Sequence, residues 1–307
     1  MNLRTLQYLV ALAETRHFGR AAQQCHVSQP TLSAQIKKLE FELGVELVER
    51  QHKNVMLTPV GERIVARARS IHGLVDEIRG LARYHQNPFA GQLSLGFIPT
   101  LGPYLLPHIV GPLADALPDL AFFFAEHQTA DLIPRLAAGE LDVVFLALPH
   151  GQVESVPLER RPLFNERFVV AMPASHVLAD AAHINAGEVA QHDLLLLQEG
   201  HCLRDQALDV CGIGGSAGDD PRRQTLAATS LETLRQMVAA GQGITLLPEL
   251  SITSDAHLGR SVIRPFTAPA PTRTIAALWR ASSVRTASIT RVCDVVVHTM
   301  QATLDAA

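Results

Sequence analysis

Apolar positions in the first 60 residues recur with the spacing of short helices. The stretches 3–15 and 18–25 each read as an amphipathic helix. A turn at 26–27 follows, and Ser28 is placed to cap a third helix that ends at Gly44. The inward positions of this third helix are expected to be Leu32, Ile36, Leu39 and Leu43. The pattern predicts three short helices around a small core.

Two short helices, a tight turn and a capped third helix are typical of a helix-turn-helix, whose last helix enters the DNA major groove. An ordinary three-helix bundle is the alternative. Stretches 45–49 and 55–57 flank a basic segment and predict a β-hairpin, which favours a winged helix-turn-helix. Arg50 and Lys53 at its tip would contact the DNA backbone or minor groove. The candidate DNA-binding residues of the third helix are Ser28, Gln29, Pro30, Thr31, Ser33, Gln35 and Lys37.

A longer helix is predicted from residue 59 to residue 86. Thr58 would cap it, with Pro59 in the first position. Its apolar positions advance in steps of three and four residues, interrupted by Arg67. They are Val60, Ile64, Ile71, Leu74, Ile78 and Leu81. A 3.5-residue period of this length is typical of a helix that pairs with a second copy of itself, although packing on its own domain is the alternative.

After a linker at 87–91, strands alternate with helices, which predicts a mostly parallel sheet. The strands are expected near 93–97, 120–126, 141–147, 168–172, 194–197, 244–248 and 271–281, with helices at 105–113, 131–138 and 288–304. Thr100 and Thr129 each follow a strand, where ligands of open α/β sheets bind. Ordinary loop and capping roles are equally open for both threonines.

Composition and charge narrow the class of protein. The chain has 307 residues, of which 47% are hydrophobic, enough for two or three domains. It shows neither a membrane-spanning apolar run nor a signal peptide, so we expect a cytoplasmic protein. Residues 1–90 carry 12 Lys and Arg against 8 Asp and Glu, whereas residues 91–307 carry 14 against 22. The basic N-terminal part favours a polyanionic partner.

Cys202 is the candidate reactive group. It follows an apolar run and Gly200, stands beside His201, and opens a stretch with helical spacing. The amides of a helix N-terminus and nearby cations favour a thiolate there. In a continuous helix Cys211 would lie about 13.5 Å along the axis, whereas a disulfide needs Cα atoms within about 7 Å. A bond between them requires unwinding, as in a redox switch; two inert buried cysteines are the alternative.

Other chemical motifs are weak. The four cysteines have no CxxC spacing, which argues against a disulfide framework or a zinc site. The segment 214–218 matches the G-x-S-x-G pattern of serine hydrolases but follows no strand, so we interpret it as a loop. The 14 histidines show no ligand spacing. We predict neither a metal nor a cofactor.

The N-terminal motifs resemble the DNA-binding domain of LysR-type transcriptional regulators. The resemblance covers the first 60 residues without a gap, through the stretches 17–22, 27–33, 36–40 and 57–61. It implies a two-lobed α/β effector domain that is similar to periplasmic binding proteins. The implied domains are 1–58, the linker helix and hinge 59–91, and the regulatory domain 92–307. Lobe I would comprise about 92–164 and 268–307, and lobe II about 165–267.

The cysteine stretch resembles the peroxide-sensing OxyR branch of that family. Residues 200–207, the nine-residue step to Cys211, and the segments 98–105, 230–239 and 273–275 all fit this branch. The resemblance implies that Cys202 is the peroxidatic thiolate and Cys211 the resolving thiol. The implied peroxide-binding and thiolate-stabilising residues are Thr100, Thr129, His201, Arg204, Asp205 and Arg273.

The same resemblance implies the partners. These are double-stranded promoter DNA, hydrogen peroxide, RNA polymerase, a thiol reductant such as glutaredoxin or thioredoxin, and further copies of the chain, paired through the linker helix and assembled as a homotetramer. We therefore expect a peroxide-responsive transcriptional regulator of oxidative-stress genes and not an enzyme. A LysR-type regulator of a small metabolite and a thiol peroxidase are the alternatives; the winged helix and the heptad helix argue against the peroxidase.

Overall fold

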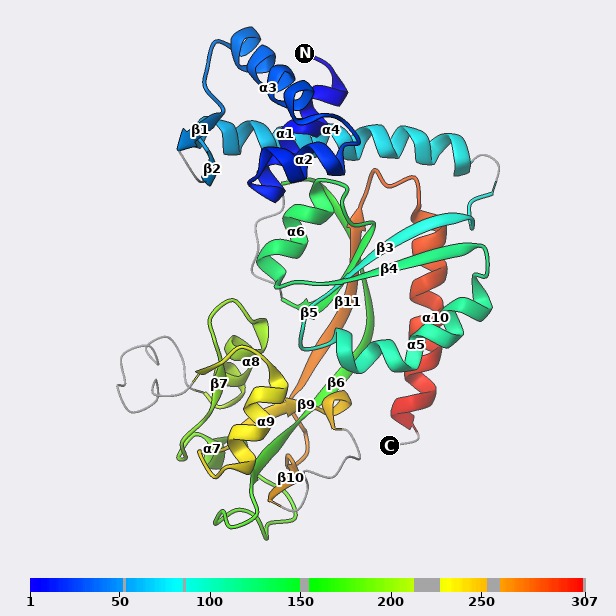
Figure 1. The fold of residues 1–307 in the computed structure, drawn as a ribbon. Helices are drawn as coiled ribbons and strands as arrows, with labels where there is room; N and C mark the ends of the chain where they lie inside the picture. Colours follow the sequence, from blue (N-terminus) through cyan, green and yellow to red (C-terminus); the bar gives the residue numbers. More distant parts are fainter. Residues whose placement is uncertain (52–53, 85–86, 150–154, 213–226, 253–259, 306–307) are drawn as a thin grey trace. The chain divides into compact units, whose positions relative to one another are not determined.

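The computed structural model describes the chain except for residues 52–53, 85–86, 150–154, 213–226, 253–259 and 306–307 (Figure 1). It divides into two compact units. The first is Met1–His85 with Ala137–Glu140, and the second is Gln86–Leu136 with Leu141–Ala307. Within the described residues, no helix has the length and apolar character that a membrane crossing requires.

The first unit contains the expected three helices, hairpin and long helix. They are α1 (Leu3–Thr15), α2 (Phe18–Gln24), α3 (Gln29–Leu43), β1 (Val48–Gln51), β2 (Asn54–Leu57) and α4 (Pro59–Tyr84). β1 and β2 pair in antiparallel register, so the predicted hairpin is confirmed. Leu32, Ile36 and Leu39 are fully buried, but Leu43 is 38% exposed. The inward placement of Leu43 was wrong because it is the last residue of α3, directly before the left-handed Gly44.

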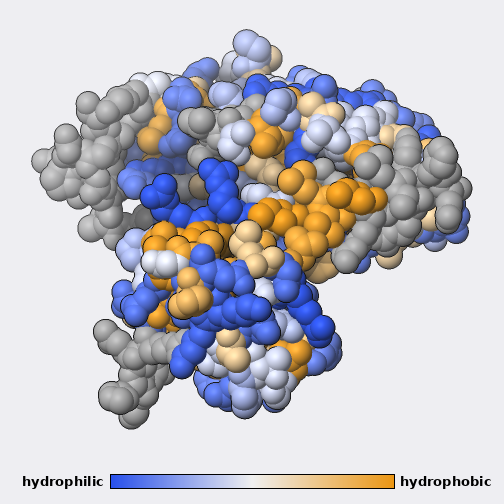
Figure 2. Space-filling view, turned by 90° about the horizontal axis from the view of Figure 1, so that it is seen from above, coloured by the Kyte–Doolittle hydropathy of each residue, from blue (hydrophilic) through white to orange (hydrophobic). Residues whose placement is uncertain are grey.

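Helix α4 begins as predicted, since Thr58 Oγ1 accepts a hydrogen bond from the Gly61 amide at 3.0 Å. One face of α4 packs on the core of the first unit through Val65 and Ala68. Leu74 and Ile78, from the heptad series, are 59% and 65% exposed. Figure 2 shows one face of the molecule, on which hydrophobic residues, in orange, lie next to one another. Because these positions on α4 are exposed, pairing of α4 with a second copy of the chain stays a prediction.

Gly61 on α4 gives a stability prediction. A Cβ atom at this position would lie 2.2 Å from the Leu47 carbonyl oxygen, so backbone must shift. Gly61→Ala is expected to destabilise the first unit by about 1–3 kcal/mol, as overpacking does. Chemical denaturation followed by circular dichroism measures this loss. Gly111→Ala is the control, because a Cβ there meets open space on α5; it should be neutral or stabilising, and equal destabilisation by both variants would contradict the steric argument.

The second unit is built on a mixed seven-stranded sheet with the order β10-β6-β11-β5-β3-β4, where β9 also pairs with β6. Its strands are β3 (Gly91–Phe97), β4 (Leu120–Glu126), β5 (Val143–Leu148), β6 (Leu158–Pro173), β9 (Thr245–Pro248), β10 (Ser261–Pro265) and β11 (Thr272–Arg280). β3 pairs in parallel with β4 and β5, but the other pairings in this sheet are antiparallel. The expectation of a mostly parallel sheet was therefore wrong. The expectation came from the alternation of strands with helices along the sequence, which does not reveal that β6 and β11 run antiparallel.

Helices and a short second sheet complete this unit (Figure 1). They are α5 (Gly102–Ala116), α6 (Thr129–Ala137), α7 (Ala186–Val189), β7 (Leu196–Leu197), α8 (Cys202–Val210), β8 (Ala227–Ala228), α9 (Leu231–Ala239), the 3-10 turn η1 (Glu249–Ser251) and α10 (Thr286–Asp305). Two hydrophobic cores organise them. One draws on residues between 93 and 163 and between 275 and 300, and we call the part around it lobe I. The other draws on residues between 168 and 266 and defines lobe II.

Strand β6 passes from one core to the other. Its first part pairs with β11, and its second part, from Phe168 onward, pairs with β9 and β10. The lobe boundary predicted near 164–165 therefore lies inside a continuous strand. The boundary predicted near 267–268 lies between β10 and β11. One continuous strand therefore connects the two lobes, with its first part in the sheet of lobe I and its second part in that of lobe II.

Candidate functional site

A glycine and a histidine directly precede α8. Gly200 has φ +95°, and a Cβ atom there would lie 2.5 Å from Gln128 Oε1. His201 takes the N-cap position in extended conformation, and Cys202 is the first residue of the helix. Strand β7 and this turn precede α8, so the predicted strand, turn and helix are confirmed. Only glycine accommodates both the backbone conformation and the approach of Gln128.

Two neighbouring residues of lobe I meet two neighbouring residues of lobe II here. Thr129 Oγ1 lies 2.9 Å from Cys202 Sγ, and Gln128 Nε2 lies 3.1 Å from His201 Nε2. Thr129 and His201 are buried, whereas Cys202 is half-buried. Thr129 is the first residue of α6, so the starts of two helices face each other. The thiol is therefore held in a polar contact while part of it stays accessible.

Thr100 and Arg273 belong to a second buried group. Arg273 on β11 donates from Nη1 to Thr100 Oγ1 at 3.0 Å and from Nη2 to the Thr100 carbonyl at 2.9 Å. Its Nε donates to Glu166 Oε2 at 2.7 Å. All three side chains are at most 4% exposed. Because Thr100 Oγ1 accepts from Arg273, its own hydroxyl hydrogen is left to donate to a further group.

Among the described contacts, no hydrogen bond joins this buried group to Cys202. The remaining two predicted residues face elsewhere as well. Arg204 donates to the carbonyl of Leu197 at 3.3 Å and so braces α8 against β7. Asp205 is exposed in the first turn of α8. The geometry thus brings Thr129 to the Cys202 thiol and Gln128 to the neighbouring His201, links Thr100 with Arg273, and gives Arg204 a bracing contact.

Cys211 lies at the opposite end of the same helix. It is the C-cap residue of α8, is 6% exposed, and its thiol is not in a disulfide. α8 is continuous over the nine residues from Cys202 to Val210. An unbroken helix of this length keeps its ends too far apart for a disulfide. Bonding between the two sulfurs requires α8 to unwind.

Burial shifts the titration of His201. Desolvation lowers its pKa from the ordinary value near 6.5. Because the folded state holds this ring neutral and the unfolded state does not, the unfolded chain binds more protons in acid. The stability contributed by the neutral ring is present above pH 6.5 and is lost as the pH falls below it.

This shift gives a pH prediction. The reduced protein is expected to be less stable at pH 5.5 than at pH 7.5, and His201→Asn should weaken that dependence. Urea unfolding of both proteins at the two pH values measures the effect. An unchanged pH dependence in His201→Asn would show that other groups carry it. His183→Asn is the control, because His183 is an exposed histidine of lobe II.

Three polar residues of the site were not anticipated from the sequence. Gln128 contacts His201, and Glu166 pairs with Arg273. Gln206 lies one helical turn after Cys202, and its buried Oε1 has no hydrogen-bond partner. A polar residue directly before Thr129, and a glutamate within the strand-forming segment at 166, were the available signals. Neither of these two sequence signals shows whether the side chain is buried against a partner or exposed to solvent.

Comparisons with known proteins identify the family. Residues 3–62 match the model "Bacterial regulatory helix-turn-helix protein, lysR family", and residues 86–301 match "LysR substrate binding domain". The chain is 46% identical over 283 residues to the Escherichia coli "DNA-binding transcriptional dual regulator OxyR", covering 92% of this chain and 90% of that protein. The chain belongs to the OxyR branch of the LysR family.

Solved OxyR structures agree with the fold. A full-length OxyR variant from Pseudomonas aeruginosa superimposes with a TM-score of 0.75 at 43% identity, covering 96% of this chain and 94% of that one. A hydrogen peroxide-bound OxyR mutant from Corynebacterium glutamicum gives a TM-score of 0.64 at 31% identity, with coverage of 98% and 92%. The expected winged helix-turn-helix followed by a two-lobed α/β regulatory domain is therefore confirmed.

Helix α3, the predicted DNA-reading helix of this LysR-family chain, begins with an exposed polar turn. Ser28 Oγ accepts from the Thr31 amide at 3.3 Å and so caps α3. Gln29, Pro30, Thr31 and Lys37 are also exposed, whereas Ser33 and Gln35 are half-buried. The side chain of Arg50 and all of Lys53 lie outside the described residues, as does the G-x-S-x-G segment 214–218. The base-contacting roles stay predictions for all nine residues.

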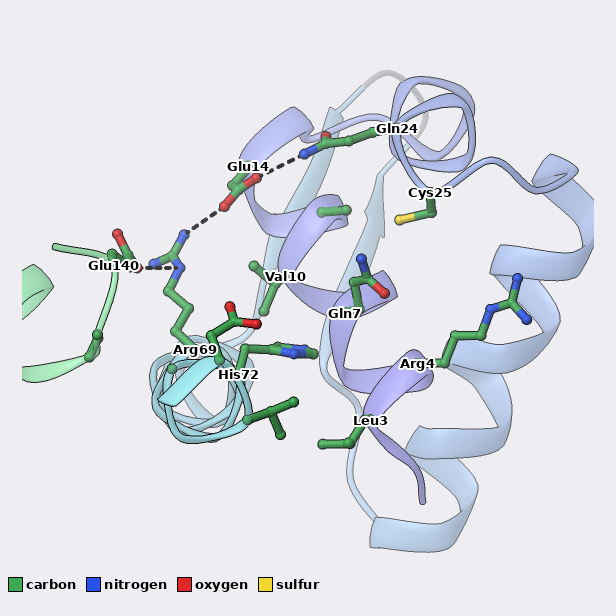
Figure 3. A pocket seen from close by; sticks show the side chains of 16 residues that line it. Leu3, Arg4, Gln7, Val10, Glu14, Gln24, Cys25, Arg69, His72 and Glu140 are labelled. Atoms are coloured by element: carbon green, nitrogen blue, oxygen red, sulfur yellow. Dashed lines mark hydrogen bonds and ion pairs between the residues drawn. The ribbon is translucent and has the colours of Figure 1, made fainter. Parts of the chain in front are cut away.

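The other two cysteines have environments that disfavour reaction. Burial raises the pKa of Cys25, and it raises the pKa of Cys293 to about 12. Cys25 lines a cavity of about 660 Å³ within the first unit, where Arg69 lies between Glu14 and Glu140 (Figure 3). None of the predicted peroxide-binding residues lines this cavity. Within the described residues, no cluster of three potential metal ligands occurs.

Proposed function

We propose that this chain senses hydrogen peroxide through Cys202 and converts its oxidation into a change in DNA contacts. The supporting observation is the placement of the thiol. Cys202 touches Thr129 across the two lobes and starts a helix whose far end holds Cys211, which is not in a disulfide. Oxidation of Cys202 therefore changes both its contact with Thr129 of lobe I and the start of helix α8. The peroxide-bound relative from Corynebacterium glutamicum supports the same ligand.

The chemistry balances with these two sulfurs alone. The Cys202 thiolate attacks one peroxide oxygen, so an S–O bond forms, the O–O bond breaks, and the hydroxide that leaves takes a proton and becomes water. Cys202 is then a sulfenic acid. The Cys211 sulfur displaces its hydroxyl group, which forms the disulfide and a second water. Two thiols have lost two electrons and one peroxide has gained them.

The other peroxide-binding residues have assigned parts in this proposal. Thr129 donates to or accepts from the reacting sulfur, and Thr100 donates to a peroxide oxygen while Arg273 holds it. His201, the residue directly before Cys202, contributes a ring N–H. Arg204 and Asp205 add a cation and an anion near the start of α8. Arg273, which is paired with Glu166, acts on the reacting group through Thr100.

The output follows from the geometry of α8. Once the disulfide forms, the helix unwinds, the contact between Cys202 and Thr129 is lost, and contacts between subunits change. We assign the winged helix to 1–58, the linker helix and hinge to 59–91 and the regulatory domain to 92–307, with lobes divided near 164 and 268. Pairing through α4 gives the dimer, and two dimers give the tetramer.

The remaining partners follow from this role. Promoter DNA is bound by α3 through Ser28, Gln29, Pro30, Thr31, Ser33, Gln35 and Lys37 and by the wing through Arg50 and Lys53. RNA polymerase is recruited at the promoter, and a thiol reductant such as glutaredoxin or thioredoxin resets the disulfide. The chain responds once per oxidation and does not turn over peroxide as an enzyme does. It acts in the cytoplasm, where promoter DNA and such reductants meet.

Footprinting tests this function. Reduced and peroxide-treated full-length protein are bound to the promoter regions of oxidative-stress genes, and transcription is measured from the same templates. We expect the two forms to protect DNA differently and only the treated form to raise transcription. Identical footprints together with unchanged transcription would reject the proposal. Thiol titration separates it from metabolite sensing, which predicts no rapid loss of two thiols with peroxide.

A further inference from the structure

Gln128 occupies a fixed position between β4 and α6. Its backbone carbonyl accepts from the amides of Asp131 at 2.9 Å and Leu132 at 3.0 Å, so it starts the first turn of α6. Its side chain is half-buried and extends to lobe II, where it covers Gly200 and reaches the ring of His201. The backbone of Gln128 is therefore anchored in lobe I while its amide group lies against Gly200 and His201 of lobe II.

The contact between Gln128 and His201 fixes a proton position. The amide nitrogen of glutamine can donate but cannot accept a hydrogen bond. With the amide oriented so that its nitrogen lies 3.1 Å from His201 Nε2, this ring atom is the acceptor of the pair and carries no hydrogen. The proton of the neutral ring then resides on Nδ1. Burial of His201, which disfavours the imidazolium, agrees with a neutral ring.

We propose that Gln128 is a positioning residue that holds His201, the residue directly before Cys202, as the neutral Nδ1–H tautomer. This inference rests on the proposed peroxide sensing and adds a residue to it. Gln128 contacts His201, and the next residue, Thr129, contacts Cys202. These two contacts together hold the ring and the sulfur in one relative orientation. The Nδ1–H is then the ring group that can donate to a peroxide oxygen. Without Gln128 the ring is free to take the other tautomer or to turn.

The alternatives at position 128 have opposite consequences. Leucine keeps a similar size but cannot donate to Nε2. Glutamate offers only acceptors when ionised, so it requires a proton on Nε2 and favours either the other tautomer or the imidazolium. Gln92 on β3 is an exposed glutamine of the same lobe and provides the matched control. These three variants separate the hydrogen bond from the loss of a polar surface group.

The first experiment reads the tautomer directly, without peroxide. Full-length reduced protein is labelled with 15N-histidine, and the His201 signals are identified as those absent from His201→Asn. We expect an unprotonated Nε2 in the unchanged chain and in Gln92→Leu. Gln128→Glu should protonate Nε2 near pH 7, and Gln128→Leu should give a mixture of tautomers. A protonated Nε2 in the unchanged chain would overturn the proposal even if peroxide sensing holds.

The second experiment measures how fast peroxide oxidises Cys202. A Cys211→Ser background lets the sulfenic acid accumulate, and a trapping reagent quantifies it. Gln128→Leu is expected to slow oxidation about ten-fold, within the range that misplaced groups at a reacting centre produce. In a His201→Ala background, the same substitution should add no further slowing, because Gln128 acts through the ring. Gln92→Leu should match the unchanged chain.

The outcomes separate the two ideas. Equal slowing by Gln128→Leu with and without His201 would assign Gln128 a merely structural role and reject the positioning inference. Failure of Cys202 to react in the unchanged chain would instead reject peroxide sensing, while the tautomer measurement still stands. If Gln128→Leu does not fold, Gln128→Glu and the spectrum of the unchanged chain decide the question.

Discussion

A Cys202→Ser variant is expected to bind promoter DNA normally and to lose the peroxide response completely. Serine keeps the size and the polar contact to Thr129, but its hydroxyl is not a nucleophile toward peroxide at neutral pH. DNA binding should persist because Cys202 lies outside the unit that carries the helix-turn-helix. Transcription from a peroxide-inducible promoter and mobility shifts of the reduced protein measure the two properties.

Cys25→Ser is the matched control for that experiment. Cys25 is also partly exposed, but burial raises its pKa and no disulfide partner is assigned to it. The control should keep the full response. A Cys202→Ser protein that still responds to peroxide would refute the assignment of the sensing thiol, and loss of the response in Cys25→Ser would extend the sensing site to the first unit.

Replacing Arg273 with methionine is expected to lower the free energy of unfolding by about 3–5 kcal/mol, the cost of leaving a buried charge unpaired. Glu166, its partner at 2.7 Å, is fully buried. The substitution also removes the donors to Thr100. Urea unfolding of the reduced full-length protein measures the loss. The same variant should oxidise more slowly, because Thr100 is no longer held.

Two control variants test whether the loss of stability in Arg273→Met comes from a buried unpaired charge. Arg167→Met breaks the Arg167–Glu249 pair, whose arginine side chain is 53% exposed, and should cost no more than about 1 kcal/mol. The double variant Arg273→Met with Glu166→Gln removes both charges and should recover part of the lost stability. If Arg273→Met and Arg167→Met cost the same, burial does not set the strength of the ion pair.

The local elements of the fold could be predicted because their signals lie in adjacent residues. The cap at Ser28, the glycine at 44 and the proline at 59 mark helix ends, and these ends are where the structure has them. Sheet direction could not be predicted in this way. Whether β6 and β11 run parallel or antiparallel depends on how the chain returns between the lobes, which strand and helix spacing does not encode.

The site was predictable only in part, for a similar reason. Cys202, Cys211 and Thr129 stand at helix ends that the sequence reveals, and their placement follows from those ends. Gln128 becomes visible only when lobe I and lobe II are brought together, and Glu166 only when β6 pairs with β11, where it lies opposite Arg273. Their partners are 73 and 107 residues away along the chain. Pairings of that range depend on the tertiary fold and not on any local pattern.

The intact α8 has a consequence for how the sensor resets. A disulfide between Cys202 and Cys211 can form only after the helix has been unwound, so the oxidised state gives up the helix contacts with lobe II, including those of Leu203 and Ala207. Each kcal/mol lost in this way makes the midpoint potential of the dithiol couple more oxidising by about 20 mV. The packing of one short helix therefore tunes the redox poise at which the switch returns to its reduced form.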